Sequence, residues 1–392
     1  MRAVLLLALT AVLLPVGAQS KPAAVPTYHL HGNGLVITPT PESITLSFGK
    51  GVTIEGKGFK LTAPQVHIAV KPTELISSGE IKLPKMPDEK QETLVEDPGK
   101  AARAMARELE LPEPQFSASA LQRIEASGGI VAEAQGITLR TPALTSTDGG
   151  RSWLAQGRTT LSRHTKDEDY QLSAGALLYD TQKQRAVAKQ GVEATVKQDG
   201  EPPIRLSADS LIFGVESGEL SLGGNLRLSY GGFTVTSSPL HGNVKSQSMS
   251  GGKLVGSGKG MQATVGQVGV NLKRQSVSAS GGVSITSDTK KLAVSAGSVG
   301  ANLKTQQLEA GGGVMLTDSQ FGVEVSAASV SANLKTKSLT ARGSPTVKFN
   351  GSTFTGETIT VSQQKGKTVV EVKGEQTAKI NPADVKRFAD TQ

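Results

Sequence analysis

Apolar and polar residues alternate along most of this chain in short runs. The alternation is clear at Val314 and Leu316, and again at Val323 and Val325, where polar or small residues stand between the apolar ones. Successive side chains of a β-strand point to opposite faces, so each run predicts a strand with one buried face. Clusters of Gly, Asn, Asp and Ser separate the runs and predict turns. No long stretch has helical periodicity, so the pattern predicts an all-β fold.

The same pattern repeats along the second half of the chain. Asn-Leu-Lys begins at Asn271, Asn302 and Asn333, a step of 31 residues, and a looser copy begins at Asn243, 28 residues before Asn271. An internal period of this size indicates stacked supersecondary units, each burying its face against its neighbours. We expect about three short strands in each 31-residue unit.

The chain divides into segments of different composition. An apolar stretch follows Arg2 and ends in Val16-Gly17-Ala18, which is typical of a signal peptide cleaved near Ala18 and therefore of export. Gly- and Pro-separated strands follow, and then a charged, Pro-rich stretch with a helix predicted from Asp97-Pro98. The predicted segments are a signal peptide at 1–18, a β segment at 19–83, an insert with a short helix at 84–115, a β-repeat region at 116–380 and a short helical tail at 381–392.

Composition restricts how such a chain is held together and what it binds. It has no Cys, 45 Gly and 4% aromatic residues, so packing of Val, Leu, Ile and Ala in thin sheets and backbone pairing must stabilise it. The net charge of +8 favours acidic partners, among them phosphorylated lipids. Nucleic acid is not an expected partner, because no dense Arg/Lys run with interleaved aromatic residues occurs.

The sequence carries no recognisable catalytic motif. It has no nucleophile elbow, phosphate-binding P-loop or zinc-protease helix motif. His29 and His31 would share one strand face, but no carboxylate follows at ligand spacing, so an ordinary surface strand is the better interpretation. We therefore expect no enzyme activity, no metal and no cofactor.

Short strand-and-turn elements resemble a known family. The repeat near the C-terminus carries Gly343, Pro345 and Phe349, then Gly356, Glu357, Ile359 and Val361, and closes at Gly374. Leu178-Tyr179-Asp180 and Ala208-Asp209 look like matching elements upstream. This pattern resembles the OstA/LptA-like family of lipopolysaccharide-transport proteins over roughly residues 28–380, the insert excepted; residues 243–340 lack the family's usual Ala-Asp and Tyr-Asp.

The resemblance implies an elongated antiparallel β-jellyroll, open at its ends and folded like a taco, whose groove carries acyl chains. The inward apolar positions of the repeats are the expected groove: Val268, Val270, Leu272, Val283, Ile285, Leu292, Val294, Val299, Leu303, Leu316, Val323, Val325, Val330 and Leu334. Few aromatic residues would leave room between facing sheets. Lys273, Lys304 and Lys335 recur at one register and would either meet lipid phosphates at the rim or form a solvated ladder that blunts sheet edges. The recurring Asn would form an inward ladder or, as we favour, cap a turn.

These features predict a periplasmic bridge that binds lipopolysaccharide or another acylated anionic lipid. The resemblance implies that an inner-membrane extractor supplies the lipid, that an outer-membrane assembly protein receives it, and that edge strands dock these partners or further copies of the chain end to end. The alternative is a β-solenoid, stalk or adhesin-like surface protein without lipid. That alternative predicts a filled core and parallel stacking of the repeats.

Overall fold

All secondary structure that the computed structural model describes is β-strand. The described residues are 27–56, 59–71, 115–117, 121–134, 136–147, 151–166, 168–289, 291–319, 322–349, 351–364, 367–375 and 377–379. They contain 28 strands, and every pairing whose register is known is antiparallel, for example β19 with β20 and β20 with β21. The all-β prediction is confirmed, and the antiparallel ladder disfavours a parallel solenoid. The predicted signal peptide, the insert apart from Gln115 and the terminal helix lie outside these residues.

The chain forms two compact units, and the first comprises described residues from 27 to 162 and from 175 to 185. Its strands are β1 (Thr27–Pro39), β2 (Ile44–Gly56), β3 (Phe59–Ala63), β4 (Gln65–Val70), β5 (Gln115–Ser117), β6 (Leu121–Ala134), β7 (Ile137–Ser146) and most of β8 (Ser152–His164). Strand β2 pairs with β1 on one side and with β3 and β4 on the other, and β6 then pairs with β3, β4 and β7. Its core is filled by closely packed aliphatic residues and Phe48. The two short strands expected at 43–48 and 52–56 form one continuous strand, β2.

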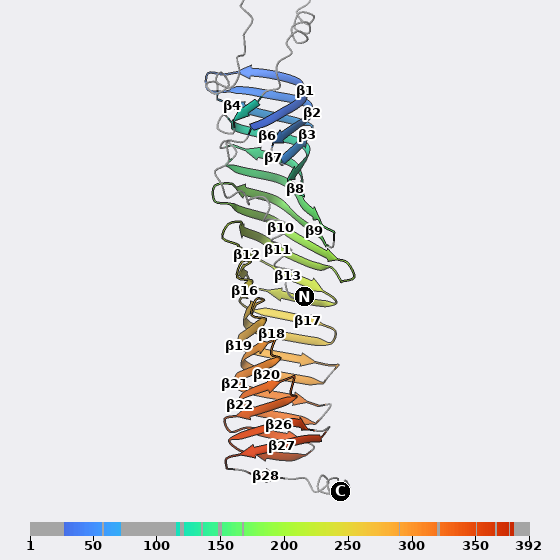
Figure 1. Cartoon of the computed structure of the whole chain (residues 1–392), viewed down its shortest axis with the longest axis vertical. Helices are drawn as coiled ribbons and strands as arrows, with labels where there is room; N and C mark the ends of the chain where they lie inside the picture. Colours follow the sequence, from blue (N-terminus) through green and yellow to red (C-terminus); the bar gives the residue numbers. More distant parts are fainter. Residues whose placement is uncertain are drawn as a thin grey trace, which may run out of the picture. The chain divides into compact units, whose positions relative to one another are not determined.

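The second unit comprises residues 163 to 174 and 186 to 379, so β9 (Glu168–Asp180) and β10 (Arg185–Gln198) contribute residues to both units. Its other strands are β11 (Ile204–Gly214), β12 (Glu219–Gly223), β13 (Leu226–Tyr230), β14 (Phe233–Ser237), β15 (Leu240–Asn243), β16 (Ser248–Gly251), β17 (Leu254–Gly258), β18 (Met261–Asn271), β19 (Ser276–Ser287), β20 (Leu292–Asn302), β21 (Gln307–Asp318), β22 (Val323–Asn333), β23 (Ser338–Arg342), β24 (Thr346–Phe349), β25 (Ser352–Thr355), β26 (Thr358–Gln364), β27 (Lys367–Lys373) and β28 (Thr377–Lys379). Figure 1 shows β18 to β22 succeeding one another in chain order.

The 31-residue repeat is a pair of long strands, and the expectation of three short strands is wrong. From Leu272 to Asn302 the chain makes a four-residue turn, the 12 residues of β19, a second four-residue turn and the 11 residues of β20. The Gly281-Gly282 pair predicts a turn. In the structure these two glycines form a β-bulge inside β19, where the register shifts between Ser280 and Val283. Both glycines have positive φ, and the strand continues beyond them. A bulge bends a strand without ending it.

Bulges of this kind, and strands that pair with two different neighbours on one side, divide the second unit into two walls. The second half of β11 continues through β12, β15, β16 and the second half of β18, which we call wall A. The first half of β11 continues through β13, β14, β17 and the first half of β18, which we call wall B. Strands β18 to β22 belong to both walls, because each crosses from one to the other at a register shift or a split in its pairing. Beyond them, β23, β26 and β27 extend wall A, and β24, β25 and β28 extend wall B.

The two walls face each other. One contacting cluster of apolar residues contains Val330 and Ala341 from wall A together with Val325 and Val347 from wall B. The line of bends is therefore the base of a V, and the strand ends are its two rims. No helix in the described part of the chain is long and apolar enough to cross a membrane.

Candidate functional site

The inner face of the V between β14 and β21 is an apolar surface that the chain's own side chains cover only in part. We call this surface the trough. Its base is buried, at Val265, Val283, Ala296 and Val314. Further up the walls the inward residues are only half-buried, among them Val235, Leu254, Val270, Val277, Ile285, Val294, Val299, Leu308 and Leu316. The exposure of an inner apolar face is the property that a lipid-binding surface needs.

The trough is bounded at both ends by a filled interior. On one side Leu211, Phe213 and Leu222 are fully buried, and on the other side Ala341, Val347 and Ile359 are fully buried. The trough itself, from β15 to β21 in wall A and from β14 to β21 in wall B, spans six strands in each wall. At about 4.8 Å a strand, the trough is roughly 29 Å long. One leaflet of a bilayer core is about 15 Å thick, so a single extended acyl chain fits lengthwise.

Gly256 widens the trough where an inner row of wall B passes through β17. Gly256 pairs with Val235 and with Ala263, and these three residues occupy one inner row of wall B. A Cβ placed on Gly256 would meet nothing closer than Val235 Cγ2, at 3.7 Å, so space remains above it. Gly242 and Gly251 take inner positions on wall A, but there Met249 and Leu240 already fill the space over them.

The base of the trough carries one polar atom without a partner. Ser237 lies between Leu226 and Leu254 in the row next to the bends. Among the buried side-chain N and O atoms of the described residues, its Oγ alone makes no hydrogen bond. A buried hydroxyl without a partner destabilises the folded state.

Eleven of the 14 predicted groove residues lie on inward-facing strand positions. Val268, Val270, Ile285, Leu292, Val294, Val299, Leu316 and Val323 are half-buried, whereas Val283, Val325 and Val330 are buried. The other three, Leu272, Leu303 and Leu334, stand in turns. Leu303 and Leu334 are 44% and 59% exposed, so they lie on the rim and outside the trough.

The sequence predicts Val283 at the base of the trough but not Val265, Ala296 and Val314, and it does not predict the trough's upstream half. Ala296 is not among the predicted groove residues because alanine is only weakly apolar. Val265 is not among them because it lies outside the runs with clear period-two alternation. Strands β14 to β17 were missed because the 31-residue step does not extend upstream of Asn271 unchanged. Val235, Leu254 and Gly256 take inward positions on alternating runs. Because glycine has no side chain, Gly256 makes the apolar alternation hard to recognise in the sequence.

The rim of wall A is formed by the Asn turns. The Asn302 side-chain oxygen accepts hydrogen bonds from the backbone N–H groups of Lys304 and Thr305, both at 3.0 Å, and Asn333 does the same for Lys335 and Thr336. The expected turn-capping role of the Asn is therefore confirmed. Lys273, Lys304 and Lys335 stand exposed on successive turns of this rim.

The rim of wall B carries a different set of residues. Tyr230 donates a hydrogen bond of 2.8 Å to Glu201 Oε2, and this bond is the main reason that the pKa of Tyr230 is raised. Lys259 Nζ lies 5.5 Å from the centre of the Phe233 ring, which is a cation–π distance. This rim combines aromatic residues with both signs of charge.

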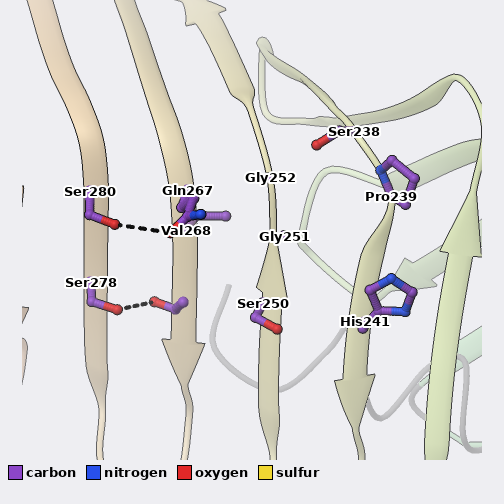
Figure 2. Close-up of a pocket in the computed structure, with 11 residues that line it drawn as sticks. Ser238, Pro239, His241, Ser250, Gly251, Gly252, Gln267, Val268, Ser278 and Ser280 are labelled. Carbon is purple, nitrogen blue, oxygen red and sulfur yellow. Dashed lines mark hydrogen bonds between the residues drawn. The ribbon is translucent and has the colours of Figure 1, made fainter.

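A separate polar hollow of about 580 Å³ lies beside the bends of β15, β16, β18 and β19 (Figure 2). It is lined mainly by serine and glycine, with His241, Gln267 and Pro239. His241 Nδ1 lies 3.0 Å from Ser221 Oγ, and Ser280 Oγ lies 3.5 Å from Gln267 Oε1. A lining of this kind does not suit acyl chains, but Gly251 and Val268, which take inner positions on wall A, also line it, so the hollow adjoins the trough. No cluster of three or more His, Cys, Asp or Glu able to hold a metal occurs within the described ranges.

Comparison with known proteins adds weak structural similarity. No protein-family model matches the chain, and no curated protein matches it. A matching solved structure is LptH from Pseudomonas aeruginosa, described as the LptA homologous periplasmic component of the lipopolysaccharide transport device. The match has 14% identity and a TM-score of 0.22, and it covers 26% of this chain and 71% of LptH. At this TM-score the similarity decides neither the fold nor the function.

Proposed function

We propose that this chain is an exported, periplasmic lipid-binding protein that shields acyl chains of lipopolysaccharide or a related envelope lipid in the trough. The observation that carries the proposal is the inner apolar face of β14 to β21, half-exposed between two filled ends. Each CH₂ group that an acyl chain buries there is worth about 0.8 kcal/mol, so binding needs no directional contact. The two facing walls of antiparallel strands and the OstA/LptA-like resemblance of the sequence support this role, and we assign the chain no catalytic step.

The filled ends suggest how lipid enters. Side chains occupy the space between the walls beyond β21 and before β14, so a lipid passing lengthwise would have to displace them. Entry over the rims requires no such rearrangement. In this proposal the trough is a bounded container for lipid passed from an inner-membrane extractor to an outer-membrane assembly protein, and the unit's edge strands dock those partners or another copy.

The test is lipid content measured by native mass spectrometry and lipid extraction of protein purified from its own envelope. Val294→Asp places a carboxylate on the trough wall and should abolish the bound lipid, because an acyl chain cannot solvate a charge. Ser295→Asp puts the same charge on the neighbouring outward position of β20 and should leave the lipid in place. Protein without extractable lipid, or equal lipid loss in both variants, would overturn the assignment.

A further inference from the structure

The rim of wall A is built as a rigid ridge of turns. The ridge comprises the turns 244–247, 272–275, 303–306 and 334–337. Each turn is capped by its Asn, and its last residue has positive φ, as at Gln275 (51°) and Gln306 (57°). The turns are also bonded to one another, because the N–H of Leu303 donates to the Gln275 carbonyl at 2.8 Å and that of Leu334 to the Gln306 carbonyl at 2.9 Å.

This rigidity keeps apolar and cationic side chains outside the fold. Each of the last three turns begins with Leu followed by Lys, and both Leu303 and Leu334 are more than two-fifths exposed. The bonded backbone cannot turn these leucines inward without losing the turn-to-turn hydrogen bonds. Successive turns are two strands apart, so the Leu-Lys pairs recur about every 9.6 Å along a line.

The charge of the ridge is entirely positive. Its four turns contain Lys245, Lys273, Arg274, Lys304, Lys335 and Lys337 and no carboxylate. The turns of wall B include Asp288, and β21 ends there in Asp318. The cationic character therefore belongs to one rim and does not follow from the net charge alone.

We infer that the ridge docks on the surface of an anionic phospholipid bilayer. Ammonium groups next to exposed leucines match the two layers of such a surface, with phosphates outside and acyl chains just beneath them. A soluble polyanion would pair with the lysines but would offer the leucines nothing. Docking here would place the open side of the trough beside lipid, but the inference does not depend on what the trough binds.

The experiment is cosedimentation of residues 19–392 with vesicles, because the apolar leader would bind membranes by itself. One set of vesicles is phosphatidylcholine, and the other contains phosphatidylglycerol at about one part in four, so that its surface is negative. We expect binding to the anionic vesicles only. A lysine near such a surface contributes about fivefold, so Lys273→Gln, Lys304→Gln and Lys335→Gln together should weaken binding roughly a hundredfold.

Two further variants make the outcome decisive. Leu303→Ser with Leu334→Ser should also weaken binding, which a purely electrostatic contact would not show. Lys189→Gln, Lys197→Gln and Lys253→Gln together remove the same charge from exposed positions outside the ridge and should retain wild-type binding. Equal binding to both vesicle types, an equal effect of the two lysine triples, or unaltered binding of the leucine variant would each overturn the inference. Lipid extracted from the ridge variants reports separately on the trough.

Discussion

Single side chains determine the turns of the second unit. Asn271, Asn302 and Asn333 occupy the same turn position in successive repeats, and each places its side-chain oxygen where one or two backbone N–H groups would otherwise lack a partner. Asp180 takes this role in the first unit, where Gln182 and Lys183 donate to its Oδ1. An acceptor on a short side chain is what this turn needs, so Asn and Asp are interchangeable there and other residues are not.

Replacing Asn302 by Ala should destabilise the protein. The N–H groups of Lys304 and Thr305 lose their acceptor, which costs about 1 kcal/mol in the free energy of unfolding. Asn302→Asp keeps the oxygen and should remain close to wild type. Urea unfolding of the two variants measures the difference. An equal loss of stability in both variants would contradict the view that Asn302 stabilises the turn through its side-chain oxygen.

At the scale of the strand, the bends of β19 and β21 contain paired glycines. Gly312 and Gly313 both have positive φ, at 76° and 80°, inside β21. A Cβ on Gly312 would stand 3.1 Å from Gly297 Cα of the neighbouring strand, whereas a Cβ on Gly313 would meet nothing within 4 Å. Gly312 is therefore needed both for its positive φ and for the close approach of the two backbones. Gly313 is needed only for its positive φ.

Substitution by alanine should separate the two roles. Gly313→Ala places an alanine in the left-handed conformation and should lower the free energy of unfolding by about 1 kcal/mol. In Gly312→Ala the new methyl group also pushes against the backbone of β20, so the loss should be clearly larger. Comparing the urea midpoints of the two variants measures the contribution of the close approach. Equal midpoints would mean that β20 and β21 can separate at the bend without penalty.

At the scale of the whole second unit, the decisive property is the space between the walls. The strands on either side of the trough use large residues inside, such as Phe213 and Ile359, whereas the trough places Gly256 and Ala263 there. Small residues and half-buried valines leave a surface that another apolar molecule can cover. This distribution, and not any single residue, supports the lipid-binding proposal.

Filling that space should reduce lipid binding without unfolding the protein. Gly256→Val adds three carbon atoms on the inner face of wall B, where its Cβ would meet nothing closer than 3.7 Å, and it would displace a similar amount of acyl chain. At about 0.8 kcal/mol a carbon, affinity should fall roughly thirtyfold or more. Ser257→Val adds apolar bulk at the adjacent outward position and should bind lipid normally. Titration with a fluorescent fatty acid compares them; undiminished binding by Gly256→Val would place the ligand elsewhere.

The sequence by itself determined the all-β class, the 31-residue step and the Asn turns, because alternation and turn chemistry act between neighbouring residues. The number of strands in a repeat was decided only by the tertiary structure. Gly281-Gly282 is locally the same as a turn, and only the pairing of β19 with β18 and β20 on both sides of it makes it a bulge. The same holds for the site. Leu303 and Val299 are equally apolar in the sequence, yet one is exposed on the rim and the other faces inward, because burial depends on the opposite wall.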